Sequence, residues 1–247
     1  MKYQERADII LETLQKQQTV KAEELSSILR TSLVTIRKDL QKLENEGKLI
    51  RIFGGATSCM VNNEEQRRMI AMQKVAGRAV QEIQDGDCVI LNAGTTNLLT
   101  VKNLSNFQSL TIITNALAIA RDLSQRKEIQ LIFLGGEMSS DAVYTRGSEA
   151  IEQLGQYKAN KVILSVSGIS CSRGITTRHM EMADLFCKMM ERAEEVIVVA
   201  DDTKIGFESF YHVCGVDVVH KLITNYSAKN EEELQQMERM GIEVCRC

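Results

Sequence analysis

Hydrophobic positions in residues 1–56 recur with the period of an α-helix in three successive segments. In residues 32–47 the apolar side chains are spaced by three or four residues, so they share one helical face. Ser32 is a favoured N-cap and Gly47 a favoured helix stop, which sets the limits of this helix. Two earlier helices are predicted at about 4–17 and 21–30. The residues expected to face inward are Ala7, Ile10, Leu14, Leu25, Ile28, Leu29, Leu33, Ile36, Leu40 and Leu43.

The residues that follow the third helix alternate between apolar and polar. The sequence KLIRIFGGA ends in Gly54-Gly55, which is typical of a short two-stranded wing. Two helices joined by a tight turn, the second one exposing polar side chains, form a helix-turn-helix, whose second helix enters the major groove of DNA. We therefore predict a winged helix-turn-helix domain over 1–56 and a linker over 57–72.

From residue 85 onward, short apolar runs alternate with amphipathic segments. This alternation predicts a mostly parallel β-sheet with helices on both faces, in an α/β domain over 73–247. Ligands in such domains bind where loops leave the carboxyl ends of the strands. The predicted strands lie at 88–93, 110–114, 129–136, 161–169, 195–201, 220–225 and 241–245, and helices at 116–123, 180–192 and 231–240.

Composition narrows the class of protein further. The 247 residues are 44% hydrophobic and 26% charged, which is ordinary for a globular protein, and no apolar run reaches the ~18 residues that span a bilayer. The first residues lack an apolar signal core, so we expect a cytoplasmic protein without a membrane partner. Seven cysteines are scattered without a Cys-x-x-Cys pair, so we expect reduced thiols, no metal site and no cofactor.

Charge is distributed unevenly along the chain. Residues 1–56 hold 10 Lys and Arg against 8 Asp and Glu, a net charge of +2, whereas the remainder carries −5 of the total of −3. A slightly basic first domain on an acidic body is compatible with separate tasks for the two parts.

Several motifs resemble the DeoR family of bacterial transcription regulators. In the first domain they are R-x3-I-x3-L at 6–14 and S-x2-T-I-R-K-D-L at 32–40. The body resembles the effector domain of that family in DGDCVILNAGTTN (85–97), TIITNALAIA (111–120), LIFLGGE (131–137), GITT (174–177) and VVADDTKIG (198–206). The resemblance implies a repressor, expected to act on sugar metabolism genes. Its C-terminal domain would be similar to ribose-5-phosphate isomerase and would sense a phosphorylated sugar or a related metabolite.

Five positions depart from the family pattern. Lys21 stands where Ser or Thr often caps the second helix, and Phe53 replaces a His of the wing. Arg30 stands where the turn often has Gly, and because a positive φ costs a non-Gly residue about 1 kcal/mol, we expect this turn to differ in detail. In the effector domain Ser167 replaces a frequent Asp and Phe186 a frequent Lys.

The third helix supplies the candidate DNA contacts. Its geometry points one set of side chains at the groove and another at phosphates or groove edges, while Ser32 could both cap the helix and meet a phosphate. The alternatives are a solvated helix face, a Thr35 that only stabilises the first turn, and an Arg37 paired with Glu44 or Asp39. The groove residues are Val34, Thr35, Lys38 and Gln41, and the phosphate residues are Arg37, Lys42, Lys48 and Arg51.

Candidate effector residues follow the predicted strands. Small residues and hydroxyls at 92–97 open a helix, where backbone N–H groups suit a phosphate, and a Lys with an Asp at 201–204 suits phosphate and sugar hydroxyls. Each of them could instead be a turn residue, a cap or a surface charge. The set is Asn92, Gly94, Thr95, Thr96, Asn97, Thr114, Asn115, Gly135, Gly136, Glu137, Thr176, Thr177, Glu181, Asp201 and Lys204.

Two other classes of protein remain open at the level of sequence. A sugar-phosphate isomerase-like enzyme with an accessory DNA-binding head would need a base such as Glu137, Glu181 or Asp201, but Ser167 and Phe186 remove expected polar groups, so we assign no catalytic residue. His179, His212 and His220 form no evident triad or metal set. A protein-binding adaptor is the other alternative. For the regulator we expect double-stranded operator DNA as a partner and a homodimer or homotetramer, because one winged domain makes a small interface.

Overall fold

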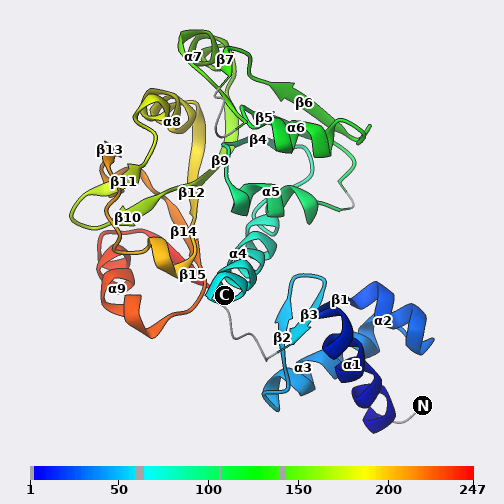
Figure 1. Ribbon diagram of the computed structural model, residues 1–247. Helices are drawn as coiled ribbons and strands as arrows, with labels where there is room; N and C mark the ends of the chain where they lie inside the picture. The colour runs from blue at the N-terminus through cyan, green and yellow to red at the C-terminus, as the bar shows by residue number, and fades with distance from the viewer. Residues whose placement is uncertain (1–2, 59–63, 106, 139–142) are drawn as a thin grey trace. The chain divides into compact units, whose positions relative to one another are not determined.

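The computed structural model describes residues 3–58, 64–105, 107–138 and 143–247 (Figure 1). The chain divides into two compact units, Met1–Ile70 and Ala71–Cys247, which we treat separately. Of the linker predicted at 57–72, residues 57 and 58 end a strand, 59–63 lie outside the described residues, and a helix begins at Glu64. The domain limits drawn from the sequence stay a prediction.

Unit 1 is a three-helix domain with a small antiparallel sheet of order β1-β3-β2. All three predicted helices and the two-stranded wing are present, and β1 is an additional strand that the sequence reading missed. Its elements are α1 (Tyr3–Gln17), β1 (Thr19–Lys21), α2 (Ala22–Leu29), α3 (Leu33–Asn45), β2 (Leu49–Ile52) and β3 (Gly55–Ser58).

The core of unit 1 lies between the three helices. Ile10, Leu25 and Ile36 are completely buried in it. The prediction that Ile28 faces inward is wrong, because its side chain is 49% exposed. On the two-turn α2, the stripe of Ala22, Leu25 and Leu29 covers the core, and Ile28 lies about 100° away from Leu29.

Unit 2 is built on a seven-stranded, entirely parallel sheet of order β15-β14-β12-β9-β4-β5-β6, which confirms the predicted α/β architecture. Each of the seven predicted apolar runs forms one of its strands. They are β4 (Cys88–Leu91), β5 (Leu110–Thr114), β6 (Ile129–Phe133), β9 (Ala159–Ser165), β12 (Ala193–Val199), β14 (Lys221–Thr224) and β15 (Glu243–Arg246).

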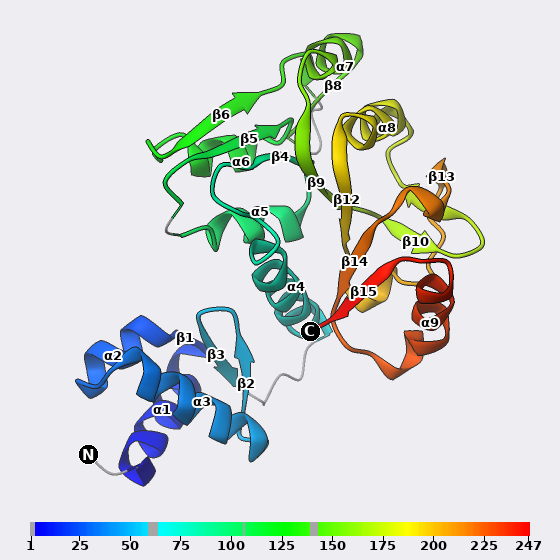
Figure 2. The same ribbon diagram turned by 180° about the vertical axis from the view of Figure 1, so that it is seen from behind.

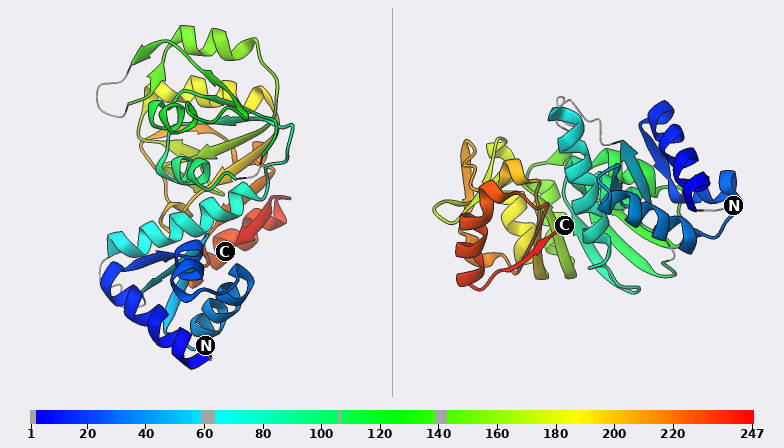
Figure 3. Two further views of the ribbon diagram at one scale, coloured as in Figure 1. Left: turned by 90° about the vertical axis from the view of Figure 1, so that its right-hand side faces the viewer. Right: turned by 90° about the horizontal axis from the view of Figure 1, so that it is seen from below.

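Helices pack on both faces of this sheet (Figures 2 and 3). One face is covered by α4 (Glu64–Val80), α5 (Thr95–Lys102) and α6 (Leu117–Leu123). The other is covered by α7 (Ser148–Gly155), α8 (Ala183–Glu191) and α9 (Glu231–Arg239). Within the described parts of the chain, no helix has the length and apolar character needed to cross a membrane.

Smaller elements surround the main sheet. A three-stranded antiparallel sheet of order β10-β11-β13 lies beside β12 and β14, far from β6 (Figures 1 and 2), and β7 pairs with β8. The sequence reading missed these short strands. They are β7 (Glu137–Met138), β8 (Thr145–Arg146), β10 (Gly168–Ser170), β11 (Gly174–Thr177) and β13 (Tyr211–Cys214), with 3-10 turns η1 (Met180–Met182), η2 (Asp202–Lys204), η3 (Val216–Val218) and η4 (Ala228–Asn230).

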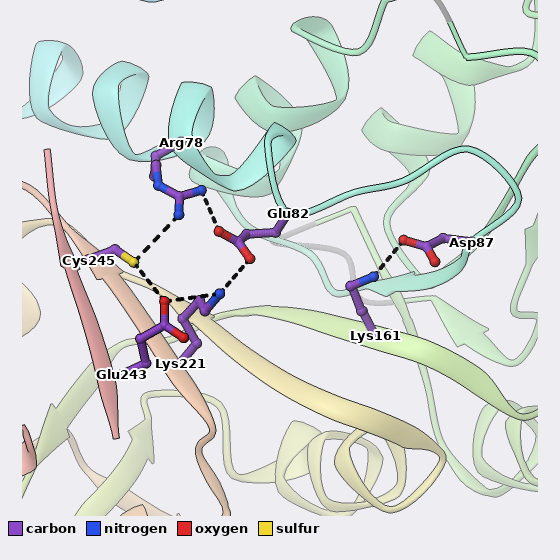
Figure 4. A network of polar contacts seen from close by, with 7 residues as sticks. All are labelled: Arg78, Glu82, Asp87, Lys161, Lys221, Glu243 and Cys245. Carbon is purple, nitrogen blue, oxygen red and sulfur yellow. Dashed lines mark hydrogen bonds and ion pairs between the residues drawn. The ribbon is translucent and has the colours of Figure 1, made fainter. Parts of the chain in front are cut away.

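Partly buried ion pairs fix the amino-terminal ends of the strands (Figure 4). Lys221 Nζ, at the start of β14, lies 2.6 Å from Glu82 Oε2, which follows α4, and 3.2 Å from Glu243 Oε1. Lys161 Nζ on β9 lies 2.7 Å from Asp87 Oδ2. Burial opposes the charge on Lys221, but its hydrogen bonds to Glu82 and Glu243 outweigh that effect and raise its pKa. These contacts hold helix and strands in register and leave the opposite edge to the loops.

Candidate DNA-binding surface and effector site

The start of α3 is closed by a side-chain cap. Ser32 has extended backbone angles, and its hydroxyl accepts a hydrogen bond from Thr35 N at 3.2 Å. The hydroxyls of Ser32 and Thr35 also lie 2.9 Å apart. Both residues therefore stabilise the first helical turn, as expected of a cap, and Thr35 is half-buried rather than fully exposed.

The polar face of α3 is open to solvent. Val34 is 62% exposed, and Arg37, Lys38 and Gln41 are exposed as well. The opposite stripe is buried in the core of unit 1, so the helix presents this face without losing its packing. An exposed apolar side chain beside cations and an amide is the combination that base edges and phosphates can use.

The wing is tied to α3 by polar contacts. Arg51 on β2 donates from Nη1 to Gln41 Oε1, and its backbone N donates to Glu44 Oε1 at 2.9 Å. Two further cations have partners within the protein: Lys42 Nζ lies 3.9 Å from the centre of the Tyr3 ring, and Lys48 Nζ lies 2.7 Å from a carboxylate oxygen of Glu46.

A largely buried ion pair that the sequence reading missed joins α1 to α3. Arg6 Nε lies 2.6 Å from Asp39 Oδ2, and Arg6 Nη2 lies 3.0 Å from Oδ1, a bidentate arrangement. The side chains are 14% and 7% exposed. Asp39 therefore binds Arg6, not Arg37. Both residues belong to the motifs that carry the family resemblance, and those motifs were the signal in the sequence that could have revealed the pair.

The turn between α2 and α3 keeps a left-handed residue in spite of the missing glycine. Arg30 has φ 47° and ψ 47°, and its backbone N donates to Ser27 O. Ser26 Oγ donates to Thr31 O at 2.6 Å across the same turn. The expectation of a different turn is therefore wrong: the surrounding contacts hold Arg30 in the strained conformation.

In unit 2, the predicted effector residues that follow the parallel strands meet at the carboxyl edge of the sheet. Asn92 follows β4, Asn115 follows β5 and Asp201 follows β12. Their side chains are nevertheless completely or almost completely buried, with Asn92 and Asn115 at 0% exposure and Asp201 at 3%. This edge thus has an inner layer of buried polar groups.

Hydrogen bonds within the protein occupy that inner layer. Asn92 exchanges two bonds of 2.8 Å with the backbone of Ser165, and Asn97 Nδ2 donates to Asn92 and to Ile163 O. Asn115 accepts from Ala93 N and donates to Thr145 O. These side chains set the positions of the loops and leave direct ligand contact to other groups.

The loop that opens α5 is the exposed part of this edge. Thr95 is exposed at the first position of the helix, while Thr96 is buried. Gly94 is required by space, because a Cβ there would lie 2.5 Å from the Ser165 side chain. The loop thereby offers a hydroxyl and helix N-terminal N–H groups to an anion.

A cluster of charged side chains lies between β7, β8 and η1. Arg146 places Nη2 3.3 Å from Glu137 Oε1 and Nη1 3.1 Å from Glu181 Oε1. Glu181 also accepts from Tyr144 Oη at 3.2 Å and faces His179 Nδ1 at 3.5 Å. The pKa of Glu181 is lowered, first by its own backbone N–H and then by Tyr144, His179 and Arg146, against the effect of burial. Arg146 thus joins the two predicted residues Glu137 and Glu181. The sequence reading missed both Arg146 and Tyr144.

The remaining predicted residues have diverse surroundings. Gly135 and Gly136 are exposed after β6, and Lys204 is half-buried. Thr176 is buried, donates to Gly168 O at 3.2 Å and accepts from Ser209 N at 2.9 Å. The other buried threonines and the aspartate accept local backbone N–H groups: Thr114 from Ala116, Thr177 from His179, and Asp201 from Thr203. Among the described residues, no group of three or more His, Cys, Asp or Glu side chains is placed to hold a metal ion.

Comparisons with known proteins match both units. The family model for the DeoR-like helix-turn-helix domain matches residues 6–61, and that for the DeoR C terminal sensor domain matches residues 67–226. The HTH-type transcriptional repressor GlcR of Bacillus subtilis (strain 168) is 34% identical, over 99% of this chain and 96% of the relative. The putative aga operon transcriptional repressor of Escherichia coli O157:H7 is 28% identical, over 97% and 92%. A solved ribose 5-phosphate isomerase of Methanocaldococcus jannaschii aligns over 57% of this chain and 55% of its own, with 16% identity and a TM-score of 0.38.

Proposed function

Because the chain belongs to the DeoR family of transcriptional regulators, we propose that it is a cytoplasmic repressor of sugar metabolism genes whose DNA affinity is set by a phosphorylated sugar or related metabolite. The observation that carries the DNA-binding part is the exposed face of α3. Val34, Lys38 and Gln41 are exposed there on a helix that is capped and buried on its other side.

We assign Val34, Thr35, Lys38 and Gln41 to the major groove. The Gln41 amide accepts from Arg51 of the wing and donates to Asn45 Oδ1 at 3.1 Å, so it exchanges these partners for a base edge when DNA binds. The phosphate contacts fall to five residues: Ser32, Arg37, Lys42, Lys48 and Arg51. Lys42 and Lys48 exchange their intramolecular partners, Tyr3 and Glu46, for phosphates when DNA binds, so their contribution to affinity is smaller than that of Arg37.

One head of this size buries too little surface for high specificity, so two heads on one assembly read paired half-sites of a duplex operator. A homodimer or homotetramer supplies them. When one head of an assembly is bound, the second head is present at its half-site at a high effective concentration. A modest change in the distance between the heads therefore changes operator affinity strongly.

The effector binds at the carboxyl edge of the seven-stranded sheet. Its phosphate lies at Thr95 and the N-terminal N–H groups of α5. Lys204 adds positive charge, and the exposed glycines at 135 and 136 leave room for the sugar. The buried set of Asn92, Asn97, Thr114 and Asn115 positions this loop.

The effector domain acts by binding rather than by catalysis. Aldose–ketose isomerisation needs a carboxylate base in contact with the substrate. Glu137 lies 3.3 Å from Arg146, Glu181 is held by Tyr144 and Arg146, and Asp201 accepts from Thr203 N. All three candidate carboxylates therefore have partners inside the protein. A turnover assay with pentose and hexose phosphates is expected to show no conversion, whereas turnover at ordinary enzymatic rates would favour the isomerase-like alternative.

The switch is tested on an operator obtained by selection from random duplex DNA. A panel of sugar phosphates is added to the full chain, and operator affinity is measured by fluorescence anisotropy. One member is expected to change the affinity by 5–150-fold, the range of a coupling of about 1–3 kcal/mol. Thr95→Val removes the exposed hydroxyl and should weaken this response, while Ser105→Ala, in an exposed loop of the same unit, should not. A metabolite that binds without changing operator affinity would contradict the switch.

A further inference from the structure

Exposed aromatic side chains are concentrated in one short segment of unit 2. The chain has six Phe, five Tyr and no Trp. Phe207, Phe210 and Tyr211 are 42%, 74% and 38% exposed, although Phe and Tyr usually bury most of their surface. Together they leave roughly 300 Å² of aromatic surface in water. A patch of this size on a folded domain often marks an interaction site.

The backbone that carries this aromatic segment, residues 207–211, is held rigidly. Gly206 N donates to Ile169 O at 2.8 Å, and Ser209 N donates to the buried Thr176 Oγ1 at 2.9 Å. Behind the segment, a Cβ at Gly168 would lie 2.2 Å from Phe207 O, so the two backbones are in close contact. Because the backbone of the aromatic segment is already fixed, little of its conformational entropy is lost when a partner packs against it.

The segment runs into a strand edge. β13 begins at Tyr211 and is the outer strand of the three-stranded sheet, paired on one side with β11. Cys187 Sγ donates to Val213 O at 3.7 Å, so α8 covers the later part of that edge. The open part is the beginning of β13, directly beside Phe210. An open edge next to apolar side chains is a ready template for a further strand.

Charge is low across the patch. Glu208 is the one formal charge in residues 207–211, and it accepts from Ser172 Oγ at 2.7 Å and lies 4.0 Å from Arg173. The centre of a protein interface is typically aromatic and depleted of charge, with charged pairs at its rim. This arrangement suits a protein surface of the same character rather than a nucleic acid or an ionic ligand.

We propose that the aromatic segment 207–211, with the beginning of β13, is the contact through which two copies of this chain associate about a two-fold axis. A two-fold axis brings the same edge of each copy together in antiparallel orientation, so one strand edge and one aromatic patch complement themselves. A stable dimer buries about 800 Å² per partner, of which the three aromatic side chains supply over a third. The proposal rests on the proposed function, since paired half-sites require a second copy.

The test is sedimentation velocity of the full chain over a range of concentrations. Phe210→Asp should raise the dissociation constant of the wild-type assembly on the order of 1,000-fold, because a symmetric interface loses two buried Phe210 side chains at once. If the wild type is a tetramer, this variant should form dimers but no tetramers. Tyr226→Asp is the matched control, because Tyr226 is also an exposed aromatic residue of unit 2, at 66%, and should leave assembly unchanged. Phe210→Ser, which adds no charge, should shift the same equilibrium in the same direction.

Two results would overturn the proposal: a wild type that stays monomeric at all concentrations, or a Phe210→Asp variant that assembles like the wild type while retaining its unfolding temperature. Operator binding by the same proteins separates the two claims. If assembly depends on Phe210 but the chain selects no DNA sequence, the proposed interface stands and the proposed function is wrong. If the Phe210→Asp protein is still fully assembled and binds DNA specifically, the proposed function stands and the proposed interface is wrong.

Discussion

The ion pair between Arg6 and Asp39 determines how α3 is held, so its removal is the most informative perturbation of unit 1. Asp39→Ala deletes two charge-assisted hydrogen bonds of 2.6 and 3.0 Å and leaves the Arg6 guanidinium, 14% exposed, without that acceptor. Removing one partner of a buried pair destabilises a protein by about 3–5 kcal/mol. Because Arg6 retains some contact with water, we expect the lower end, about 3 kcal/mol.

That loss is large relative to the stability of the unit. At 0.05–0.15 kcal/mol per residue, a unit of 70 residues has a free energy of unfolding of roughly 4–10 kcal/mol. Asp39→Ala should therefore leave unit 1 marginally stable while unit 2 is unaffected. The double variant Arg6→Met with Asp39→Leu should recover most of the loss, because a well-packed apolar pair can replace a buried ion pair.

Hydrogen exchange of the full chain measures this effect in each unit separately. The slowest amides of α1 and α3 should exchange on the order of 100-fold faster in Asp39→Ala, which corresponds to about 3 kcal/mol in the opening free energy. Amides of β9 and β12 serve as the internal control. Exchange in α1 and α3 that changes less than about threefold would show that the pair does not hold α3 in place.

Three further predictions concern the turn, the anchor of the sheet and the thiols. Arg30→Gly should relieve the left-handed conformation and raise the stability of unit 1 by about 1 kcal/mol in urea unfolding; no gain would show that its contacts outweigh the strain. Lys221→Met should cost unit 2 about 3 kcal/mol by leaving Glu82 with one fewer partner in a largely buried site; an unchanged unfolding midpoint would contradict this. Burial raises the pKa of Cys214 to about 12, so its alkylation should accelerate about tenfold per pH unit from pH 7 to 10, without a plateau near 9. Since this folded pKa is raised, the protonated thiol stabilises unit 2 below the unfolded pKa of about 8.5, and this contribution should fall as pH rises above it.

Much of the fold follows from local sequence pattern. Seven apolar runs became the seven parallel strands. The pattern is clearest in the central strands, because a strand buried on both faces is apolar at nearly every position. The cap at Ser32 and the buried stripe of α3 likewise follow from helical geometry. The hydrophobic pattern was insufficient to place Ile28, because a two-turn helix needs only a narrow apolar stripe to cover the core. It was also insufficient for β10, β11 and β13, which are too short to show the alternation of a strand.

The sites were harder to predict because they depend on contacts between distant residues. The sequence marked Glu137 and Glu181 separately, but nothing in the spacing indicated that Arg146 joins them. The sequence suggested Asp39 only as a possible partner of Arg37, whereas its partner lies on another helix. Polar residues at strand ends were expected to face a ligand, yet Asn92 and Asn97 turn inward and donate to backbone carbonyls of the neighbouring strand β9.

The central claim is that the exposed face of α3 recognises a DNA sequence, and an anisotropy titration of the full chain on duplex DNA selected from a random library tests it directly. The wild type should bind the selected duplex at least 10³-fold more tightly than a scrambled one at the same salt concentration. Lys38→Ala should lose much of that ratio, Arg37→Ala should reduce the salt slope by about 1, and Lys229→Ala, an exposed cation of unit 2, should change neither. Equal affinity for selected and scrambled DNA, or a Lys38→Ala protein indistinguishable from the wild type, would contradict the account.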